Sequence, residues 1–425
     1  MLSQALAQGV PALVAATLVL TVARAAGRAA RLLHQPMVIG EVAAGLLFVP
    51  AMSVTLGRSA VAVLLPPGVR DALDVIGEVG LVLFLAAVAH KIRCHPVGMR
   101  GRSLAWVVAG TSVPAFACGA LVAAWLTWQG SPALRGSAPS PALALLLADA
   151  FMITAVPVLA RLLEDRAMAR SSVGSVAMTA ALAVDVIGWF VLALAIGWAA
   201  NDLTDAAGAA TAAVAMAGAA VALHYALRSG PAHRLRAEAP AVFAAGLACL
   251  VLAVAAVGEH HKLTGVPGAL LVGLALPPAA TPRHDRAMRA LDGFGRFLVP
   301  VYFVTTGIHL LARPLPAAPC MVVLVVAVLA VAGKAAGTYA GAWIAGYPQA
   351  FRLRLTVLMN IRGLTELVLL QVGYTAGILT ASLFLVLAAV ALISTAVAGP
   401  LLTVIDGCEA KAGQTGTSRQ KGRRQ

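Results

Sequence analysis

The chain has 425 residues, of which 60% are hydrophobic and only 11% are charged. Soluble domains carry roughly 25% charged residues, so this composition excludes a soluble globular protein and indicates an integral membrane protein. The net charge of +14 would favour nucleic acid in a soluble protein, but in a membrane protein basic residues first set topology, and we expect no nucleic-acid partner. The five cysteines are scattered without CxxC or CxxH spacing, which excludes a disulfide framework and a zinc or iron site.

A helix that crosses the hydrocarbon core of the bilayer needs about 20 mostly apolar residues. This rule predicts thirteen transmembrane spans, near residues 7–25, 36–54, 72–90, 103–127, 142–163, 173–199, 207–226, 239–258, 264–279, 296–312, 319–345, 354–378 and 379–405. We therefore expect a transmembrane domain over residues 1–405, embedded in the lipid bilayer. A basic tail over residues 406–425 is expected to be cytoplasmic and disordered.

Basic residues indicate the orientation of these spans. If the tail is cytoplasmic, thirteen crossings place the N-terminus outside, and 24 of the 31 Lys and Arg residues fall in cytoplasmic segments against five in outside segments. This bias is a strong positive-inside pattern. We expect a multi-pass protein of the cytoplasmic (inner) membrane.

Several ionisable residues lie inside the predicted spans, where each costs at least ~2.5 kcal/mol and needs a partner, a water cavity or a function. Asp185 is in the middle of the sixth span, and Lys334 lies among small residues of the eleventh. Arg362 and Glu366, four residues apart in the twelfth, can pair along one helix face. Asp149 in the fifth span is a weaker candidate. The alternatives are a protonated structural carboxyl, a lysine that reaches the interface and a purely structural ion pair.

Two predicted spans contain a weak point in the helix. Pro157, in ITAVPVLARLL, removes a backbone donor and frees carbonyl groups near Ile153 and Thr154, while Gly363 lowers helix propensity in IRGLTE. Unwound backbone in a membrane must be buried in protein or line a polar cavity; a proline kink used only for shape is the alternative. The two spans are seven apart and so run in opposite directions, a pattern that points to the midplane site of a secondary transporter. The sequence holds no phosphate loop, kinase motifs or catalytic triad, and we expect neither an enzyme nor an ATP-driven pump.

From about Leu13 to Leu402 the chain resembles the monovalent cation:proton antiporters that include Kef-type, NapA-type and plant CHX-type exchangers. The blocks similar to the family's motifs, in the family's order, are HQPMVIGEVAAGLL, ITAVPVLARLL followed by MTAALAVDVIGWFVLAL, TGVPGALLVGLALP, LVPVYFVTTGIHL, GKAAGTYAG and LMNIRGLTELVLLQVG. The resemblance implies an all-α polytopic membrane protein of the NhaA/NapA type. Such a fold has about 13 transmembrane helices in inverted repeats, with two broken crossing helices. It also implies a core domain that moves as an elevator past a dimerisation domain, usually in a homodimer.

The resemblance also implies roles for single residues. Asp185 matches the family's ion- and proton-binding carboxylate, and Thr154 with nearby carbonyl groups matches the ligands at the broken helix. Lys334 matches the lysine of the eleventh span, and Arg362 with Glu366 matches the charged pair of the twelfth.

The chain departs from the family pattern at the ion site. Electrogenic members carry two adjacent acids there, whereas here the first position is Val184, and Asp149 is an acid outside the pattern. With one titrating carboxylate at the site, we expect one proton to exchange for one cation, without net charge movement. We expect Asp149 or Glu366 to hold Lys334 charged through the cycle.

These observations predict a secondary antiporter that exchanges Na⁺ or K⁺ for H⁺ and needs no cofactor. One desolvated carboxylate holds either the proton or the metal ion, and the other cation ligands are oxygens, among them that of Thr154. The main alternative is an organic-anion symporter on the same fold, which Lys334 and Arg362 could serve. A channel or membrane receptor is a more distant alternative. The sequence leaves the choice between Na⁺ and K⁺ open.

Overall fold

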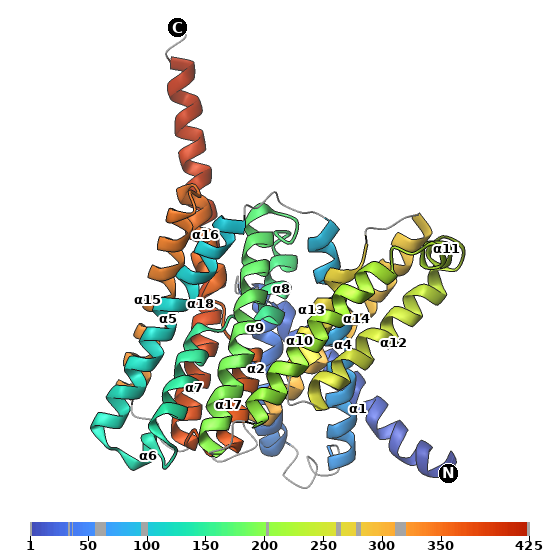
Figure 1. The fold of residues 1–425 in the computed structure, drawn as a ribbon, viewed down its shortest axis with the longest axis horizontal. Coiled ribbons are helices and arrows are strands. Elements are labelled where there is room, and N and C mark those ends of the chain that lie inside the picture. Colours follow the sequence, from blue (N-terminus) through green and yellow to red (C-terminus); the bar gives the residue numbers. More distant parts are fainter. Residues whose placement is uncertain are drawn as a thin grey trace. The chain divides into compact units, whose positions relative to one another are not determined.

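The computed structural model describes residues 2–32, 35, 37–55, 65–94, 101–200, 204–260, 265–277, 282–310 and 320–422. Every regular element in these ranges is an α-helix, as expected (Figure 1). The helices are α1 (Leu2–Leu32), α2 (Met37–Thr55), α4 (Pro67–Cys94), α5 (Gly101–Gln129), α6 (Pro132–Arg135), α7 (Ser140–Met152), α8 (Val156–Asp165), α9 (Ser172–Ala200), α10 (Thr204–Ala226), α11 (Gly230–Glu238), α12 (Pro240–His260), α13 (Gly265–Ala275), α14 (Pro282–Leu310), α15 (Cys320–Ile344), α16 (Gln349–Met359), α17 (Leu364–Thr375) and α18 (Ala381–Gly422).

Within the described ranges, eight helical stretches are long and apolar enough to cross a membrane. They are Leu13–Leu32, Pro67–Lys91, Gly101–Gln129, Ser140–Asp165, Ser172–Ala199, Pro240–Val257, Cys320–Ile344 and Ala381–Gly407. A helix satisfies its own backbone hydrogen bonds, which is why apolar runs of this length fold as helices in lipid. The other five predicted spans overlap α2, α10, α13, α14 and the pair α16 and α17. The count of thirteen stays a prediction.

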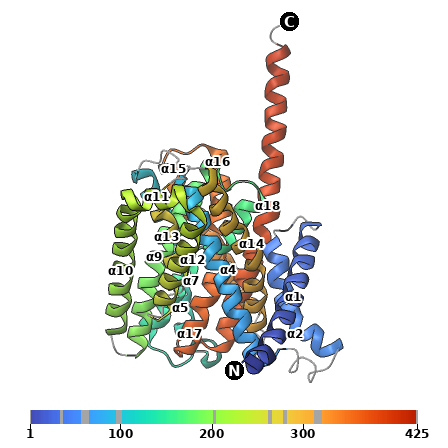
Figure 2. The same cartoon turned by 90° about the vertical axis from the view of Figure 1, so that its right-hand side faces the viewer.

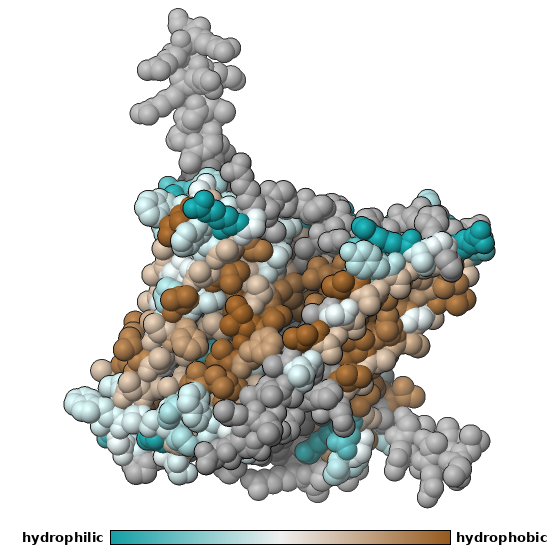
Figure 3. Space-filling model, in the orientation of Figure 1, coloured by the Kyte–Doolittle hydropathy of each residue, from teal (hydrophilic) through white to brown (hydrophobic). Residues whose placement is uncertain are grey.

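One compact unit consists of Met1–Val97, Ala160–Arg170 and Ile196–Pro316. In this unit α4 packs against α13 and α14, α14 packs against α2, and α1 lies beside α2 (Figure 2). Glycine allows the close approach of α4 and α14, because a Cβ atom at Gly295 would lie 2.6 Å from the backbone nitrogen of Phe84. Apolar side chains run along α12, whereas hydrophilic side chains gather over the short, arginine-containing α11 (Figure 3).

The second compact unit consists of Gly98–Leu159, Ser171–Ala195 and Ala317–Gln425. Here α5 packs against α7 and α15, and α15 packs against α16 and α18. Gly337 and Gly341, four residues apart on α15, let the backbones of α5 and α15 meet: a Cβ atom at Gly337 would lie 2.2 Å from the carbonyl oxygen of Gly110. This close packing places Lys334, one turn before Gly337, inside the unit.

Two helices of the second unit are interrupted where the sequence weakens them. The chain leaves helical geometry at residues 153–155, between α7 and α8, and Pro157 is the second residue of α8, where its missing N–H costs nothing to the helix. It leaves helical geometry again at residues 360–363, between α16 and α17. Gly363 has φ = 148°, in the region that favours glycine.

The last helix continues into the predicted basic tail. Helix α18 runs from Ala381 to Gly422, so most of residues 406–425 continues the last apolar helix. No proline interrupts the chain after Pro400, which leaves the helix free to continue. Residues 423–425 lie outside the described part of the chain.

Candidate functional site

The end of α7 leaves carbonyl groups that its own helix cannot satisfy, because residue 153 turns to extended backbone (φ −63°, ψ 148°). The ammonium group of Lys334, in α15, donates to the carbonyl oxygens of Met152 at 2.7 Å and Ile153 at 2.5 Å. It also donates to Thr154 Oγ1 at 2.6 Å. Lys334 is fully buried, and it therefore places a positive charge at the negative end of the α7 dipole.

Arg362, in the second break, satisfies the carbonyl groups just before these. Its Nη1 donates to Ala150 O at 2.7 Å, and its Nη2 donates to Phe151 O at 2.9 Å and to Ala330 O of α15 at 3.1 Å. Nη1 also donates to Glu366 Oε1 at 3.0 Å, and both side chains of this ion pair are buried. Two cations from distant segments therefore hold the end of one broken helix.

The two breaks face each other directly. Thr154 Oγ1 donates to the carbonyl oxygen of Met359 at 3.1 Å, and the backbone N–H of Ala155 donates to Ile361 O at 3.1 Å. Helix α17, which follows the second break, packs against α7, which precedes the first. This arrangement agrees with two interrupted helices that run in opposite directions, which stays a prediction of the sequence.

A third helix supports the second break through Thr395 of α18. The backbone N–H of Arg362 donates to Thr395 Oγ1 at 3.0 Å, and this hydroxyl donates in turn to Arg362 O. One buried side chain thus satisfies both backbone groups of the residue that lies at the break.

Two carboxylates lie beside these breaks without a hydrogen-bond partner among the described residues. Asp149 on α7 is fully buried, Asp185 on α9 is 2% exposed, and all four of their carboxylate oxygens are unpaired in this way. Gly188 lies three residues after Asp185, on the same face of α9, and a Cβ atom there would lie 2.8 Å from Asp149 Oδ1. Asp149 therefore faces the side of α9 that carries Asp185.

The composition of this site suits a monovalent ion. Three acids (Asp149, Asp185 and Glu366) and two bases (Lys334 and Arg362) are buried in the second unit, which gives a formal charge of −1 when all are ionised. Buried carboxylates without a partner are costly, so they favour a bound proton or cation. Carboxylate, hydroxyl and carbonyl oxygens are the ligands that hard cations prefer.

The site residues that the sequence singles out all lie in the second unit: Asp149, Thr154, Pro157, Asp185, Lys334, Arg362, Gly363 and Glu366. Two contacts in the structure differ from those expected from the sequence. The Arg362–Glu366 pair exists, but it joins the break to the first turn of α17 rather than lying along one helix face. Neither Asp149 nor Glu366 forms an ion pair with Lys334, because the carbonyl groups of the first break and Thr154 take its hydrogens instead.

Sequence reasoning missed two contributors to the site, Gly188 and Thr395. Gly188 carries a signal, since its spacing from Asp185 puts both on one helix face. Thr395 carries none, because its partner Arg362 is 33 residues away in the chain.

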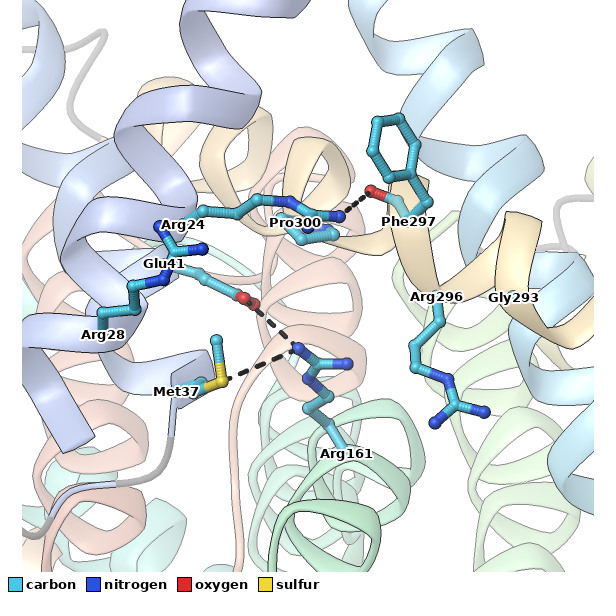
Figure 4. Close-up of a pocket in the computed structure, with 9 residues that line it drawn as sticks. All are labelled: Arg24, Arg28, Met37, Glu41, Arg161, Gly293, Arg296, Phe297 and Pro300. Atoms are coloured by element: carbon cyan, nitrogen blue, oxygen red, sulfur yellow. Dashed lines mark hydrogen bonds and ion pairs between the residues drawn. The ribbon is translucent and has the colours of Figure 1, made fainter.

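A separate group of charged side chains lies in the first unit. Glu41 is fully buried and lies 3.6 Å from Arg161 of α8, beside a pocket of about 350 Å³ (Figure 4). Lys91 of α4 lies 2.7 Å from Glu164 and 2.9 Å from Asp292 of α14. These ion pairs hold the short segment Ala160–Arg170 within its unit.

The chain is similar to a family of ion exchangers and to several antiporters. Residues 14–405 match the profile of the family described as "Sodium/hydrogen exchanger, transmembrane". Two similar proteins of Arabidopsis thaliana are Cation/H(+) antiporter 20, 30% identical over 392 residues, and Cation/H(+) antiporter 17, 28% identical over 389 residues. Each alignment covers 88% of this chain and 46% of the relative, so the chain spans about half the length of these relatives.

A relative of similar length is Na(+)/H(+) antiporter NhaS4 of Synechocystis sp. (strain ATCC 27184 / PCC 6803 / Kazusa), 27% identical over 390 residues that cover 88% of this chain and 91% of the relative. Among solved structures, the sodium proton antiporter MjNhaP1 from Methanocaldococcus jannaschii at pH 8 aligns with a TM-score of 0.60. That alignment covers 94% of this chain and 98% of the other at 14% identity, which shows a shared fold.

Proposed function

The chain belongs to the sodium/hydrogen exchanger family of multi-pass membrane proteins, and from that membership we propose that it exchanges Na⁺ or K⁺ for H⁺ across the cytoplasmic membrane. Relatives named as Na(+)/H(+) and K(+)/H(+) antiporters support both cations as candidates. The observation that carries the proposal is the pair of buried, unpaired carboxylates beside two facing helix breaks.

The proposed mechanism is competition for Asp185. Its carboxylate is buried and has no hydrogen-bond donor among the described residues, so its negative charge is neutralised either by a proton or by a metal ion. Thr154 is proposed as a second cation ligand. Its hydroxyl donates to Met359 O and accepts from Lys334, which leaves one lone pair for an ion.

The two buried cations have positioning roles in this proposal. Lys334 and Arg362 donate to the carbonyl groups of α7, and Arg362 also pairs with Glu366. The ammonium hydrogens of Lys334 and the Nη hydrogens of Arg362 are therefore directed to protein acceptors, which argues against their use for an organic anion.

Alternating access is proposed to follow an elevator mechanism in a homodimer, with the N-terminus outside and the C-terminus in the cytoplasm. The division into two compact units supports this view, since all the candidate ion-site residues lie in one of them.

We further propose that thirteen spans cross the membrane. We also propose that exchange is electroneutral, because position 184 is a valine and the formal charge of the buried site is balanced by one positive charge.

The test measures proton movement in everted membrane vesicles after addition of NaCl, KCl or the sodium salt of a bile-acid-like anion. Wild-type protein is expected to move protons with Na⁺ or K⁺, and Asp185→Asn, which keeps the size of the side chain, is expected to reduce this signal to that of vesicles without the protein. The matched control is Asp285→Asn, at a half-exposed acid on α14, which should exchange like wild type. Wild-type rates in Asp185→Asn, or a response to the organic anion alone, would contradict the proposal.

A further inference from the structure

Asp149 has no function in the mechanism above, yet its surroundings are those of an ion ligand. It lies on the last full turn of α7 before the break, where its carbonyl oxygen accepts from Ile153 N at 2.9 Å. Its side chain is fully buried, and neither carboxylate oxygen has a donor among the described residues. A buried polar group without a partner is costly to keep, so a ligand there would remove a penalty.

The Asp149 side chain points toward the face of α9 that carries Asp185. Its Oδ1 lies in the space beside Gly188 that a side chain would fill, three residues from Asp185 on the same face of α9. At this position the absence of a Cβ atom is what admits the carboxylate. Both carboxylates also lie within electrostatic range of Lys334, which pairs with neither of them.

The formal charges of the buried residues also favour Asp149 as an ion ligand. The buried Arg362 is neutralised by Glu366 at 3.0 Å, which leaves Lys334 as one positive charge for the two aspartates. The remaining single negative charge matches one monovalent cation lying between the two carboxylates. Position 184, where some exchangers have a second acid, is a valine here. Asp149, which lies 36 residues before Asp185 in the chain, thus supplies a second acid beside the site.

Resting on the proposed function, we propose that Asp149 is a second direct ligand of the transported cation and that it sets a preference for Na⁺ over K⁺. Attraction to a carboxylate falls with distance, so the smaller ion gains more from each added carboxylate. A site with two carboxylates has a stronger field than a site with one, and a stronger field favours the smaller ion.

The test compares half-saturating concentrations of Na⁺ and K⁺ for proton exchange in proteoliposomes of wild type and Asp149→Asn. We expect the value for Na⁺ to rise tenfold or more and that for K⁺ to rise less than threefold, with a smaller change in maximal rate. A purely structural role would change both ions alike. An unchanged ratio of the two values would therefore overturn the inference, whether or not both values rise.

A second pair of variants keeps the inference testable if Asp149→Asn does not fold. Gly188→Ala adds a methyl group 2.8 Å from Asp149 Oδ1 and should raise the half-saturating Na⁺ concentration several-fold, whereas Gly218→Ala on α10, where nothing lies within 4 Å, should not. Wild-type behaviour of Gly188→Ala would then overturn the inference. Failure of the proposed function is distinguishable, because in that case wild-type protein itself moves no protons with Na⁺ or K⁺.

Binding is measured separately from transport by the thermal stability of the detergent-solubilised protein in NaCl, in KCl and in choline chloride. A ligand that binds only the folded protein raises its unfolding temperature. Na⁺ should stabilise wild type more than K⁺ does, and Asp149→Asn should lose this difference. A difference that persists in the variant would overturn the assignment of Asp149 as a ligand.

Discussion

Lys334 directs its ammonium hydrogens to oxygens of a broken helix. An ammonium group has three donors, and Met152 O, Ile153 O and Thr154 Oγ1 all lie within 2.7 Å of it. Removing a cation from water costs several kcal/mol, so such a group stays buried only where its hydrogens are used. Lys334 is therefore part of the frame that shapes the first break, and its charge acts on Asp149 and Asp185 from there.

Substitution of Lys334 by Met should destabilise the protein. The change leaves two carbonyl oxygens and one hydroxyl without their donor, and each unsatisfied buried group costs about 1–3 kcal/mol. We expect the unfolding temperature in detergent to fall by about 5 °C or more. Thr338→Val, one turn along α15, removes only a hydrogen bond to Thr111 and should cost much less. Equal losses in the two variants would contradict this role of Lys334.

At the scale of single residues, the sequence identifies the important side chains better than their partners. Asp185, Lys334 and Arg362 are conspicuous because ionisable groups are rare at membrane depth. Two of the three acceptors of Lys334 could not be predicted, since they lie 182 and 181 residues earlier in the chain and are backbone atoms that any residue would offer. The hydrogens of Lys334 go to these oxygens rather than to an acid, and the expectation that Asp149 or Glu366 holds it charged through the cycle stays a prediction.

Two interrupted helices and one continuous helix form the frame of the site. The breaks bind each other through Thr154 and Ala155, and α18 holds the second break through Thr395. Because Thr395 satisfies both the N–H and the carbonyl group of Arg362, it fixes the backbone from which the guanidinium reaches α7.

Thr395→Val keeps the shape of the side chain and removes the hydroxyl, so two buried backbone groups of Arg362 lose their partner. We expect a loss of stability of about 2–4 kcal/mol, from two unsatisfied groups, and a lower maximal rate of exchange. The control is Ser394→Ala, whose hydroxyl donates only to Ala391 O of its own helix and should change little. The measurements are thermal unfolding in detergent and exchange in proteoliposomes. A stability like that of wild type would show that α18 does not hold the break.

At the scale of elements, local chemistry predicted the positions of both breaks, because Pro157 and Gly363 act on their own helical turns. The number of spans was harder to establish. Helices α13, α16 and α17 have 11, 11 and 12 residues, well below the length of about 20 that a single crossing needs. Apolar runs in the sequence do not reveal where a helix stops inside them.

The whole molecule combines two compact units, and neither is continuous in the sequence. If the unit that holds the ion site carries one positive charge in each direction, once as Na⁺ and once as H⁺, a full transport cycle moves no net charge across the membrane. We expect the equilibrium Na⁺ gradient in proteoliposomes to be the same at 0 and −100 mV, set by a K⁺ gradient and valinomycin. One net charge per cycle is worth about 2.3 kcal/mol per 100 mV and would shift the gradient more than tenfold.

Liposomes that contain Asp185→Asn are the control for ion leakage in that experiment. A shift that depends on voltage in wild type alone would refute electroneutral exchange. It would assign a second proton to Asp149 or Lys334, the other two charged groups near Asp185.

The order of synthesis adds a constraint on how this membrane protein is made. The oxygens at the end of α7 enter the bilayer 182 residues before Lys334 and, for Ala150, 212 residues before Arg362. At 5–20 residues per second, roughly 10–40 s separate the acceptors from their donors. Throughout that interval the nascent helix exposes carbonyl groups that lipid cannot satisfy. Until then, water, the translocation machinery or earlier helices must satisfy the carbonyl groups of the fifth predicted span. In a chain that stops before residue 334 these groups would stay unsatisfied, and we expect membrane quality control to degrade such a chain.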